Sequence, residues 1–201
     1  MVANHPGVAD AAALFVALDA RPDLLVLAAD REFFRCLPNL GRHLIAVPQH
    51  LAHRAEPLRR ARAHLRAGGA VLTFPAGRIE PDPALRLDAA DALATWSQST
   101  AVLVRGEPGT IVLPVAVSGV LSVRALRHPL ARRFALADDR ERAAATLQVF
   151  VPWLRETLVR VVVGRPIGPG ELGPRPTRAE VSRLVGQGMS RIVRAPAQPR
   201  R

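Results

Sequence analysis

Short apolar runs alternate along this chain with longer segments that are rich in helix-forming residues. The runs end at glycine, proline or small polar residues, as buried strands do. Strands that alternate with helices pair mostly in parallel, because each helix carries the chain back over the sheet. We therefore expect an α/β fold with a layered sheet and flanking helices. Expected strands lie at 24–28 and 44–47, and three more lie within longer segments. In 71–78 a strand runs into a Pro/Gly turn, in 111–119 a strand ends at a small polar turn, and 161–167 holds the last one.

Helix signals fall between and after these strands. They consist of alanine-rich runs, apolar residues at helical spacing, acidic residues in a first turn, and glycine or proline at the ends. The expected helices are 9–20, from Pro57 to just before Gly68, from about Asp88 through Trp96, through 143–150, and about 178–193.

The chain has 201 residues, which suits one domain with a sizeable core. We expect this domain to span residues 1–194. A Pro/Gly-rich connector at 166–176 precedes the last helix, and no internal repeat is found. Residues 195–201 are rich in proline and arginine, so we predict a disordered tail there.

The net charge is +11, and the basic residues are all arginine, because the chain contains no lysine. Arginine binds phosphate with a bidentate fork, so this surplus suits nucleic acid, an anionic membrane or phosphorylated substrates. Nucleic acid is the weakest of these partners, since tyrosine is absent and aromatic residues make up only 4% of the chain. We predict an anionic membrane surface and no nucleic acid.

Targeting and redox signals are sparse. Cys36 is the single cysteine, which excludes an internal disulfide and predicts a structural thiol. The sequence has no signal peptide and no apolar run near the roughly 20 residues that a spanning helix needs. We expect the protein on the cytoplasmic side of a bacterial cell.

The segment from Asn4 to Asp10 places His5 five residues before a carboxylate. A histidine can take a proton from an alcohol near neutral pH, and a carboxylate can hold its ring in the useful tautomer. On one helix the two side chains would point about 140° apart, so they meet only if His5 lies in a turn before the helix. Pro6 and Gly7 supply that turn. A chance pairing of the two residues is the competing interpretation.

Three later segments strengthen the catalytic interpretation: Val71–Arg78, Ile111–Gly119 and Val161–Ile167. With the opening segment, and in this order, they resemble the glycerolipid acyltransferase family of the 1-acylglycerol-3-phosphate acyltransferase type. The resemblance runs from Val2 to about Ile167.

This resemblance implies a glycerol-3-phosphate acyltransferase-like fold and transfer of a fatty acyl group to a hydroxyl. His5 would be the general base and Asp10 would orient it. The donor would be acyl-CoA or acyl carrier protein, and the acceptor a lysophospholipid such as lysophosphatidic acid. No cofactor and no metal are expected. The enzyme would be peripheral to the inner face of the membrane.

In the family, a Phe-Pro-x-Gly block helps to bind the glycerol phosphate of the acceptor. It corresponds here to Phe74, Pro75, Gly77 and Arg78, with Arg78 as the expected phosphate contact. A plain turn at a strand end, with Phe74 packed and Gly77 at positive φ, explains the same residues, and both interpretations can hold at once. Backbone amides after Gly7 or around Gly77 are the candidates for stabilising the oxyanion.

The sequence also departs from the family pattern. Ala76 stands where the family has glutamate, and Ile79 and Glu80 replace an arginine or serine-bearing tail. The acceptor-binding arginine expected near Val47 is missing, with Arg42 or Arg54 as possible substitutes. Family members place membrane-binding helices upstream of the histidine, so we expect either a shortened member or an earlier natural start.

Residues 120–134 mix apolar and arginine side chains, a pattern that suits a bilayer interface. Pro129 argues against a single amphipathic helix, and an ordinary packed segment with a solvated basic side explains the pattern equally well. Two other functions compete with acyl transfer. One is a lipid- or acyl-CoA-binding relative that has lost catalysis, and the other is a basic nucleic-acid binder.

Overall fold

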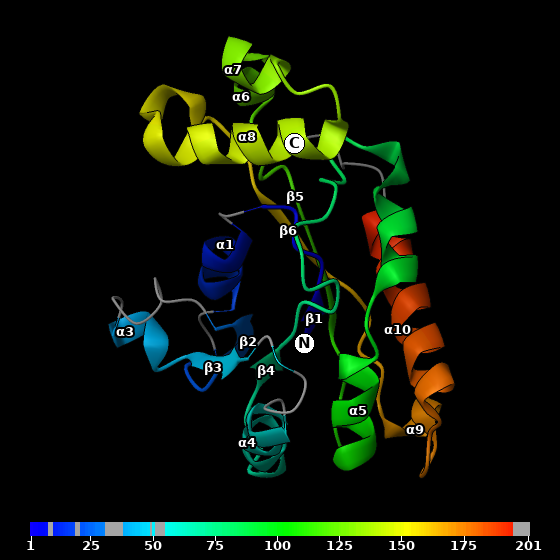
Figure 1. Cartoon of the computed structure of the whole chain (residues 1–201). Coiled ribbons are helices and arrows are strands. Elements are labelled where there is room, and N and C mark those ends of the chain that lie inside the picture. Colours follow the sequence, from blue (N-terminus) through cyan, green and yellow to red (C-terminus); the bar gives the residue numbers. More distant parts are fainter. Residues whose placement is uncertain (8–9, 19–20, 31–37, 49, 51–54, 195–201) are drawn as a thin grey trace.

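The structure is a computed structural model that describes residues 1–7, 10–18, 21–30, 38–48, 50 and 55–194. It is a mixed α/β fold, as the alternating pattern predicts (Figure 1). The predicted tail at 195–201, Cys36 and Arg54 lie outside the described residues. The domain limits of 1–194 stay a prediction.

The elements run along the chain as follows: β1 Val2–Ala3, α1 Asp10–Ala17, β2 Leu25–Ala29, α3 Pro38–Gly41, β3 Leu44–Val47, α4 Ala55–Arg66, β4 Val71–Leu72, the 3₁₀ helix η2 Leu87–Thr95, α5 Ser99–Gly106, β5 Pro114–Ser118, α6 Val123–Arg127, α7 Pro129–Arg132, α8 Ala137–Phe150, the 3₁₀ helix η3 Pro152–Leu154, β6 Arg160–Val163, α9 Pro169–Leu172 and α10 Arg178–Val193.

The strands form two small sheets that meet edge to edge. One has the order β3-β2-β4 and is parallel; in the other, of order β1-β5-β6, β1 and β5 are parallel and β6 is antiparallel. A bridge between Val2 and Thr73 joins them, with the Ala3 amide donating to the Thr73 carbonyl at 3.0 Å. β1 therefore lies between β4 and β5, and the parallel strands share one carboxyl-terminal edge.

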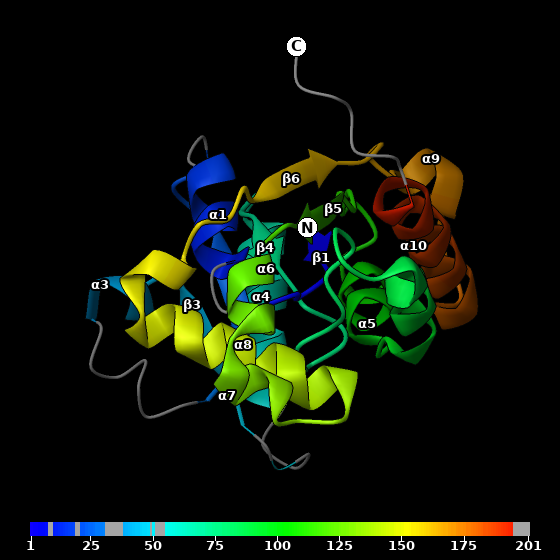
Figure 2. The same ribbon diagram turned by 90° about the horizontal axis from the view of Figure 1, so that it is seen from above.

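Successive side chains of β5 point to opposite faces of this sheet, as strand geometry requires. Val115 and Val117 pack in the same cluster as Leu14 of α1. Ala116 lies in the cluster that holds Met189 of α10 together with residues of α5. Helix α1 thus covers one face, and α5 and α10 cover the other (Figures 1 and 2). Helix α4 packs on β3 and β4 in a further cluster shared with α5.

Most predicted elements are found close to their expected positions. Helix α10 begins where the sequence predicts because Thr177 and Glu180 form a reciprocal capping box. Two predictions need correction. Strand β4 is only two residues long, and the helix expected to carry Trp96 is the 3₁₀ helix η2, which ends at Thr95. It ends there because Trp96 becomes extended and its side chain turns toward Glu80.

The mixed segment at 120–134 forms two short helices, α6 and α7, and not one long amphipathic helix. Pro129 starts α7 at its first position, where a missing amide hydrogen costs nothing. In the described part of the chain, no helix combines the length and the apolar character that crossing a bilayer requires.

Asp82 connects two loops at the carboxyl-terminal edge of the sheet. Its side chain is fully buried, and it accepts hydrogen bonds from the amides of Gly119 and Val120 at 2.8 Å and from Leu121 at 3.1 Å. The amide of Ala84 donates a fourth bond at 2.9 Å. These four donors replace the water that a buried carboxylate gives up, so the loop after β5 is held against the loop after β4.

We expect Asp82→Ala to destabilise the fold by roughly 3 kcal/mol, because several buried amides lose their acceptor at about 1–3 kcal/mol each and water recovers part of this. Chemical denaturation measures the change. The matched control is Asp91→Ala, whose side chain is exposed and 3.9 Å from Arg194, and which should change stability by less than about 0.5 kcal/mol. Equal effects of the two substitutions would contradict the role of Asp82.

Candidate active site

The candidate site begins where β1 ends. The Asn4 side chain donates to the Val117 carbonyl at 2.8 Å and accepts from the Val117 amide at 2.7 Å. The side-chain amide of Asn4 thus makes the two bonds to β5 that the backbone of a longer β1 would make. His5 follows directly, at the carboxyl-terminal edge of the parallel strands, where α/β folds commonly place ligand-binding residues.

His5 and Asp10 are in contact, as expected for a histidine that lies in a turn just before the helix. His5 Nδ1 lies 2.6 Å from Asp10 Oδ2, and the Asp10 side chain is fully buried. Asp10 also accepts from the Ala11 amide at 2.6 Å and, more weakly, from the Gly7 amide at 3.3 Å. An ionised carboxylate only accepts, so the neutral imidazole carries its proton on Nδ1. Nε2 is then free to accept a proton, and no described residue forms a hydrogen bond with it.

Glu80 holds the backbone of His5 on both sides. The His5 amide donates to Glu80 Oε2 at 2.9 Å, and the Glu80 amide donates to the His5 carbonyl at 2.8 Å. The other carboxylate oxygen of Glu80 accepts from the Trp96 indole at 2.6 Å. The turn that carries the imidazole is therefore fixed by side-chain and backbone bonds from the loop after β4.

Burial and the neighbouring negative charges act in opposite directions on the pKa of His5. Burial lowers the pKa of His5, but the hydrogen bond and charge of Asp10, together with the charge of Glu80, outweigh burial and raise that pKa above its ordinary value of 6.5. For the Glu80 carboxyl, burial has the opposite effect and raises the pKa, although the hydrogen bonds from Trp96 and His5 oppose this change. Two carboxylates thus raise the pKa of this histidine.

The Phe-Pro-x-Gly residues form a turn beside the histidine. The Phe74 ring lies 5.0 Å from the His5 ring, centroid to centroid. The Gly77 amide closes the turn by donating to the Phe74 carbonyl at 3.1 Å, and Gly77 has a φ of 62°, which glycine adopts without strain. Pro75 is buried, while Arg78 is exposed and donates to Thr95 Oγ1 at 3.2 Å. The structure therefore brings this block to His5.

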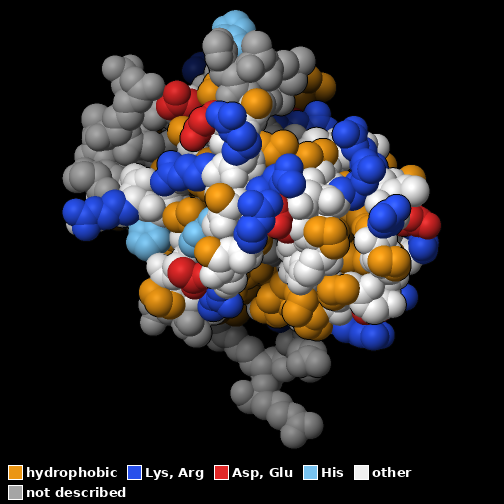
Figure 3. All heavy atoms as spheres, turned by 90° about the horizontal axis from the view of Figure 1, so that it is seen from below, with side chains coloured by type: hydrophobic (Ala, Val, Ile, Leu, Met, Phe, Trp, Pro, Cys, Tyr) orange, Lys and Arg blue, Asp and Glu red, His pale blue; other side chains and the backbone are white. Residues whose placement is uncertain are grey.

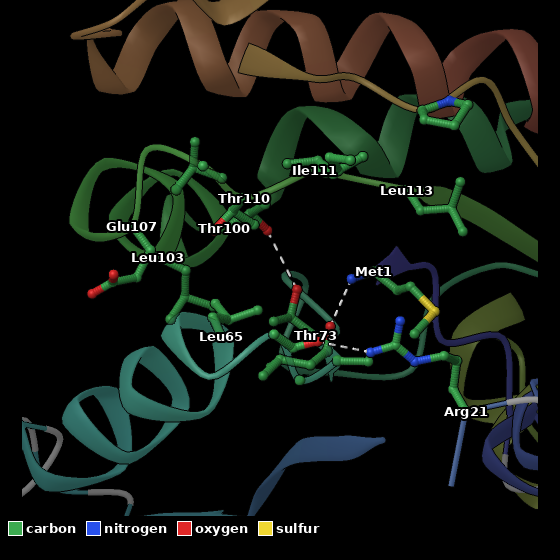
Figure 4. Close-up of a pocket in the computed structure, with 18 of the residues that line it drawn as sticks. Met1, Arg21, Leu65, Thr73, Thr100, Leu103, Glu107, Thr110, Ile111 and Leu113 are labelled. Carbon is green, nitrogen blue, oxygen red and sulfur yellow. Dashed lines mark hydrogen bonds between the residues drawn. The ribbon is translucent and has the colours of Figure 1, made fainter. Parts of the chain in front are cut away.

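Two cavities flank the sheet on the side of α5. The larger, about 710 Å³, lies between α4, α5 and the amino-terminal ends of the central strands; Met1, Thr73 and Leu103 are among its lining residues (Figure 4). It lies toward the end opposite to His5. Figure 3 shows the molecule from that end, where arginine and apolar side chains lie side by side. The smaller, about 490 Å³, lies between η2 and α10 and is lined by Pro75 and Trp96.

The smaller cavity adjoins the candidate site, because Pro75 follows Phe74 and Trp96 binds Glu80. The linings of the two cavities include Thr100 in common but do not include His5. The His5 side chain is instead 29% exposed, which leaves it accessible at the edge of the sheet. In the described part of the chain, no three His, Cys, Asp or Glu side chains gather in a group that could hold a metal ion.

Several sequence-based candidates are not brought to the site. Arg42 precedes β3 and lies at the amino-terminal edge of the parallel strands, opposite to His5. Of the amides considered for the oxyanion, that of Gly77 already donates to the Phe74 carbonyl. Residues 8 and 9, directly after Gly7, lie outside the described residues. Arg42 is therefore not available to the site, and the remaining amides after Gly7 and around Gly77 stay a prediction.

The sequence analysis missed Asn4, Glu80, Asp82 and Trp96. Their bonds to the backbone of other elements set the position of the site, and such long-range partners leave no periodic signal. A usable sign was present: two acidic residues alternate with prolines at 80–83, immediately after the Phe-Pro-x-Gly turn. Prolines bring no amide hydrogen, so neighbouring carboxylates must find donors elsewhere.

Comparison with protein-family models, with curated proteins and with solved structures gives no match for this chain.

We expect Glu80→Gln to lower the pKa of the His5 ring, because the substitution removes a negative charge that favours the imidazolium. An NMR titration of the histidine ring signals measures this directly. Glu56→Gln, on α4, is the control of equal charge change and should leave the His5 pKa in place. An unchanged His5 pKa in the Glu80 variant would show that this carboxylate does not act on the imidazole.

Proposed function

We propose that the protein transfers a fatty acyl group from acyl-CoA or acyl carrier protein to a hydroxyl of a glycerolipid, with lysophosphatidic acid as the reference acceptor. The observation that supports this most is the 2.6 Å contact between His5 and a buried carboxylate, in a turn that the Phe-Pro-x-Gly block adjoins. The resemblance to glycerolipid acyltransferases, including their layered α/β fold, supplies the reaction class.

In the proposed reaction, His5 Nε2 takes the proton of the acceptor hydroxyl as its oxygen attacks the thioester carbonyl carbon. Asp10 stabilises the imidazolium that forms and keeps the ring in place. The tetrahedral intermediate then expels the thiolate, and the proton passes from His5 to the sulfur. The products are an ester and a free thiol, so atoms and charge balance without a covalent enzyme intermediate.

Arg78 is the proposed contact for the acceptor phosphate. It is exposed, follows the glycine of the turn, and within the described residues bonds only to the neutral Thr95 hydroxyl. Its charge is therefore not neutralised by a hydrogen-bonded carboxylate. A guanidinium in this state can accept a phosphate by exchanging a weak bond for a charge-assisted one.

His5→Ala should abolish thiol release from acyl-CoA in the presence of lysophosphatidic acid, while circular dichroism shows an intact fold. Asp10→Asn should lower kcat by about 10²–10⁴-fold, because the ring loses its orienting carboxylate. Full activity in the His5 variant would refute the proposal. Exposed His50→Ala is the control for histidine loss and should behave as wild type.

The pH profile gives a second, independent readout of the same pair. The base must be neutral, so the rate should fall as pH drops through the raised pKa of His5, above 6.5. In Asp10→Asn the residual activity should show this acid limb at lower pH, since the factor that raises the pKa most is gone. A limb that stays in place in the variant would assign the titration to another group.

Arg78→Gln should raise KM for lysophosphatidic acid by about 10-fold or more with a smaller effect on kcat, as expected for the loss of a charge-assisted bond. Monoacylglycerol, which has no phosphate, separates this role from a structural one, because the substitution should not affect its KM. Exposed Arg105→Gln on α5 is the control. An equal loss with both acceptors would contradict phosphate binding by Arg78.

A lipid- or acyl-CoA-binding protein without catalysis is the second candidate. The positions of the cavities favour it, because the larger cavity lies away from His5 and the smaller one reaches the site only through Pro75 and Trp96. Saturable binding of acyl-CoA without any thiol release, for all acceptors tested and unaffected by His5→Ala, would establish this function in place of acyl transfer.

A further inference from the structure

The chain between Val123 and Leu158 exposes an unusual share of large apolar side chains. It contains eight of the twelve large apolar residues that are exposed in the described part of the protein, so they are concentrated and not scattered. Phe150 is 77% exposed and Trp153 is 72% exposed. The eight residues are Val123, Leu130, Phe134, Leu136, Val149, Phe150, Trp153 and Leu158.

The inner side of the same helices is built largely from small side chains. Alanines form most of the buried cluster among α6, α7, α8 and η3: Ala125, Ala131, Ala144 and Ala145. Leu121 and Leu154 complete this cluster, whereas the larger Phe150 and Trp153 stay outside, although burying a large apolar side chain contributes about 1.5–3 kcal/mol. Large apolar side chains on the outside therefore indicate a surface that a partner covers.

Positive charge accompanies this apolar surface. The stretch Val123–Phe134 contains four arginines and no acidic residue. Arg124 pairs with Glu156 at 2.5 Å. The side chains of Arg127, Arg132 and Arg133 are exposed and form no hydrogen bond or ion pair with the described residues. Over the whole stretch Val123–Leu158, seven arginines outnumber four acidic residues, so a partner that covers it has to supply negative charge together with an apolar environment.

This surface lies at the same end of the molecule as His5. Asp82 binds the amides of Gly119, Val120 and Leu121, which lead directly into α6. A Cβ on Gly7 would lie 3.0 Å from a methyl group of Val120, so the loop that leads to α6 touches the turn that carries His5. Figure 1 shows α6, α7 and α8 beyond the end of β5, and Figure 2, from above, shows them in front.

We propose that the exposed apolar and arginine side chains of Val123–Leu158, here named the α6–η3 surface, dock on an anionic phospholipid bilayer. The apolar side chains enter the interface, with Trp153 at headgroup depth, and the arginines bind lipid phosphates. One partner thus both neutralises the arginines and covers the apolar side chains. A second copy of the chain would bring two arginine clusters together, and nucleic acid would leave the apolar residues uncovered.

The proposal rests on the proposed function only for its purpose, which is to bring the turn at His5 to a lipid acceptor. Its test is a binding measurement that involves no turnover. The intact protein is mixed with vesicles of equimolar phosphatidylglycerol and phosphatidylcholine, or of phosphatidylcholine alone, and bound protein is separated by flotation. We expect binding to the anionic vesicles that weakens as salt is raised, and much weaker binding to phosphatidylcholine.

Two double substitutions test the surface itself. Arg132→Gln with Arg133→Gln should weaken binding by about 30-fold, since each arginine near an anionic surface contributes roughly fivefold. Arg59→Gln with Arg60→Gln, on exposed positions of α4, makes the same charge change elsewhere and should leave binding intact. Phe150→Gln with Trp153→Gln should also weaken binding, whereas Leu87→Gln with Ile111→Gln, exposed outside the surface, should not.

Absence of binding to the anionic vesicles, or equal losses in the matched pairs, would overturn the proposal. So would a concentration-dependent dimer that the Phe150 and Trp153 substitutions dissociate without any vesicle binding, because a second copy would then cover the surface. His5→Ala should bind vesicles as wild type does. Failure of acyl transfer and failure of docking are therefore observed separately.

Discussion

The contact between the His5 imidazole and the buried Asp10 carboxylate is the interaction from which the site is built. It exists only because the chain leaves β1 through Pro6 and Gly7 before α1 begins, which brings side chains five residues apart to 2.6 Å. The contact in turn selects the ring tautomer, frees Nε2 and raises the pKa of the histidine. Without this turn the sheet edge would carry an isolated histidine with no defined chemistry.

Two further carboxylates give the turn its position. Glu80 binds the backbone of His5, and Asp82 binds the backbone that leads from β5 into α6. Both come from the loop after β4, and both are buried among donors, so the loop connects His5, the Phe-Pro-x-Gly turn and the start of the α6–η3 surface. The loop after β4 therefore holds both the proposed catalytic histidine and the proposed membrane contact, which fixes their relative orientation.

Local patterns predicted much of the fold. Buried strands, the glycine-terminated α4 and the capped α10 each depend on residues within a few positions of one another, so their positions follow from the chain alone. The same holds for His5 and Asp10. Glu80 and Trp96 escaped detection because their partners lie 75 and 16 residues away, at distances where no periodicity operates. The exposure of the large apolar side chains on the α6–η3 surface also needed coordinates, since the sequence alone allowed either side of those helices to face inward.

The tautomer of His5 is the most direct test of the account, because it reports the Asp10 contact without any substrate. Nitrogen-15 NMR of the ring, recorded above the pKa of His5, distinguishes a proton on Nδ1 from a proton on Nε2. The account predicts the Nδ1-protonated form, with Nε2 unprotonated and able to accept the hydroxyl proton. A ring protonated on Nε2, or an equal mixture of both forms as in free histidine, would contradict it.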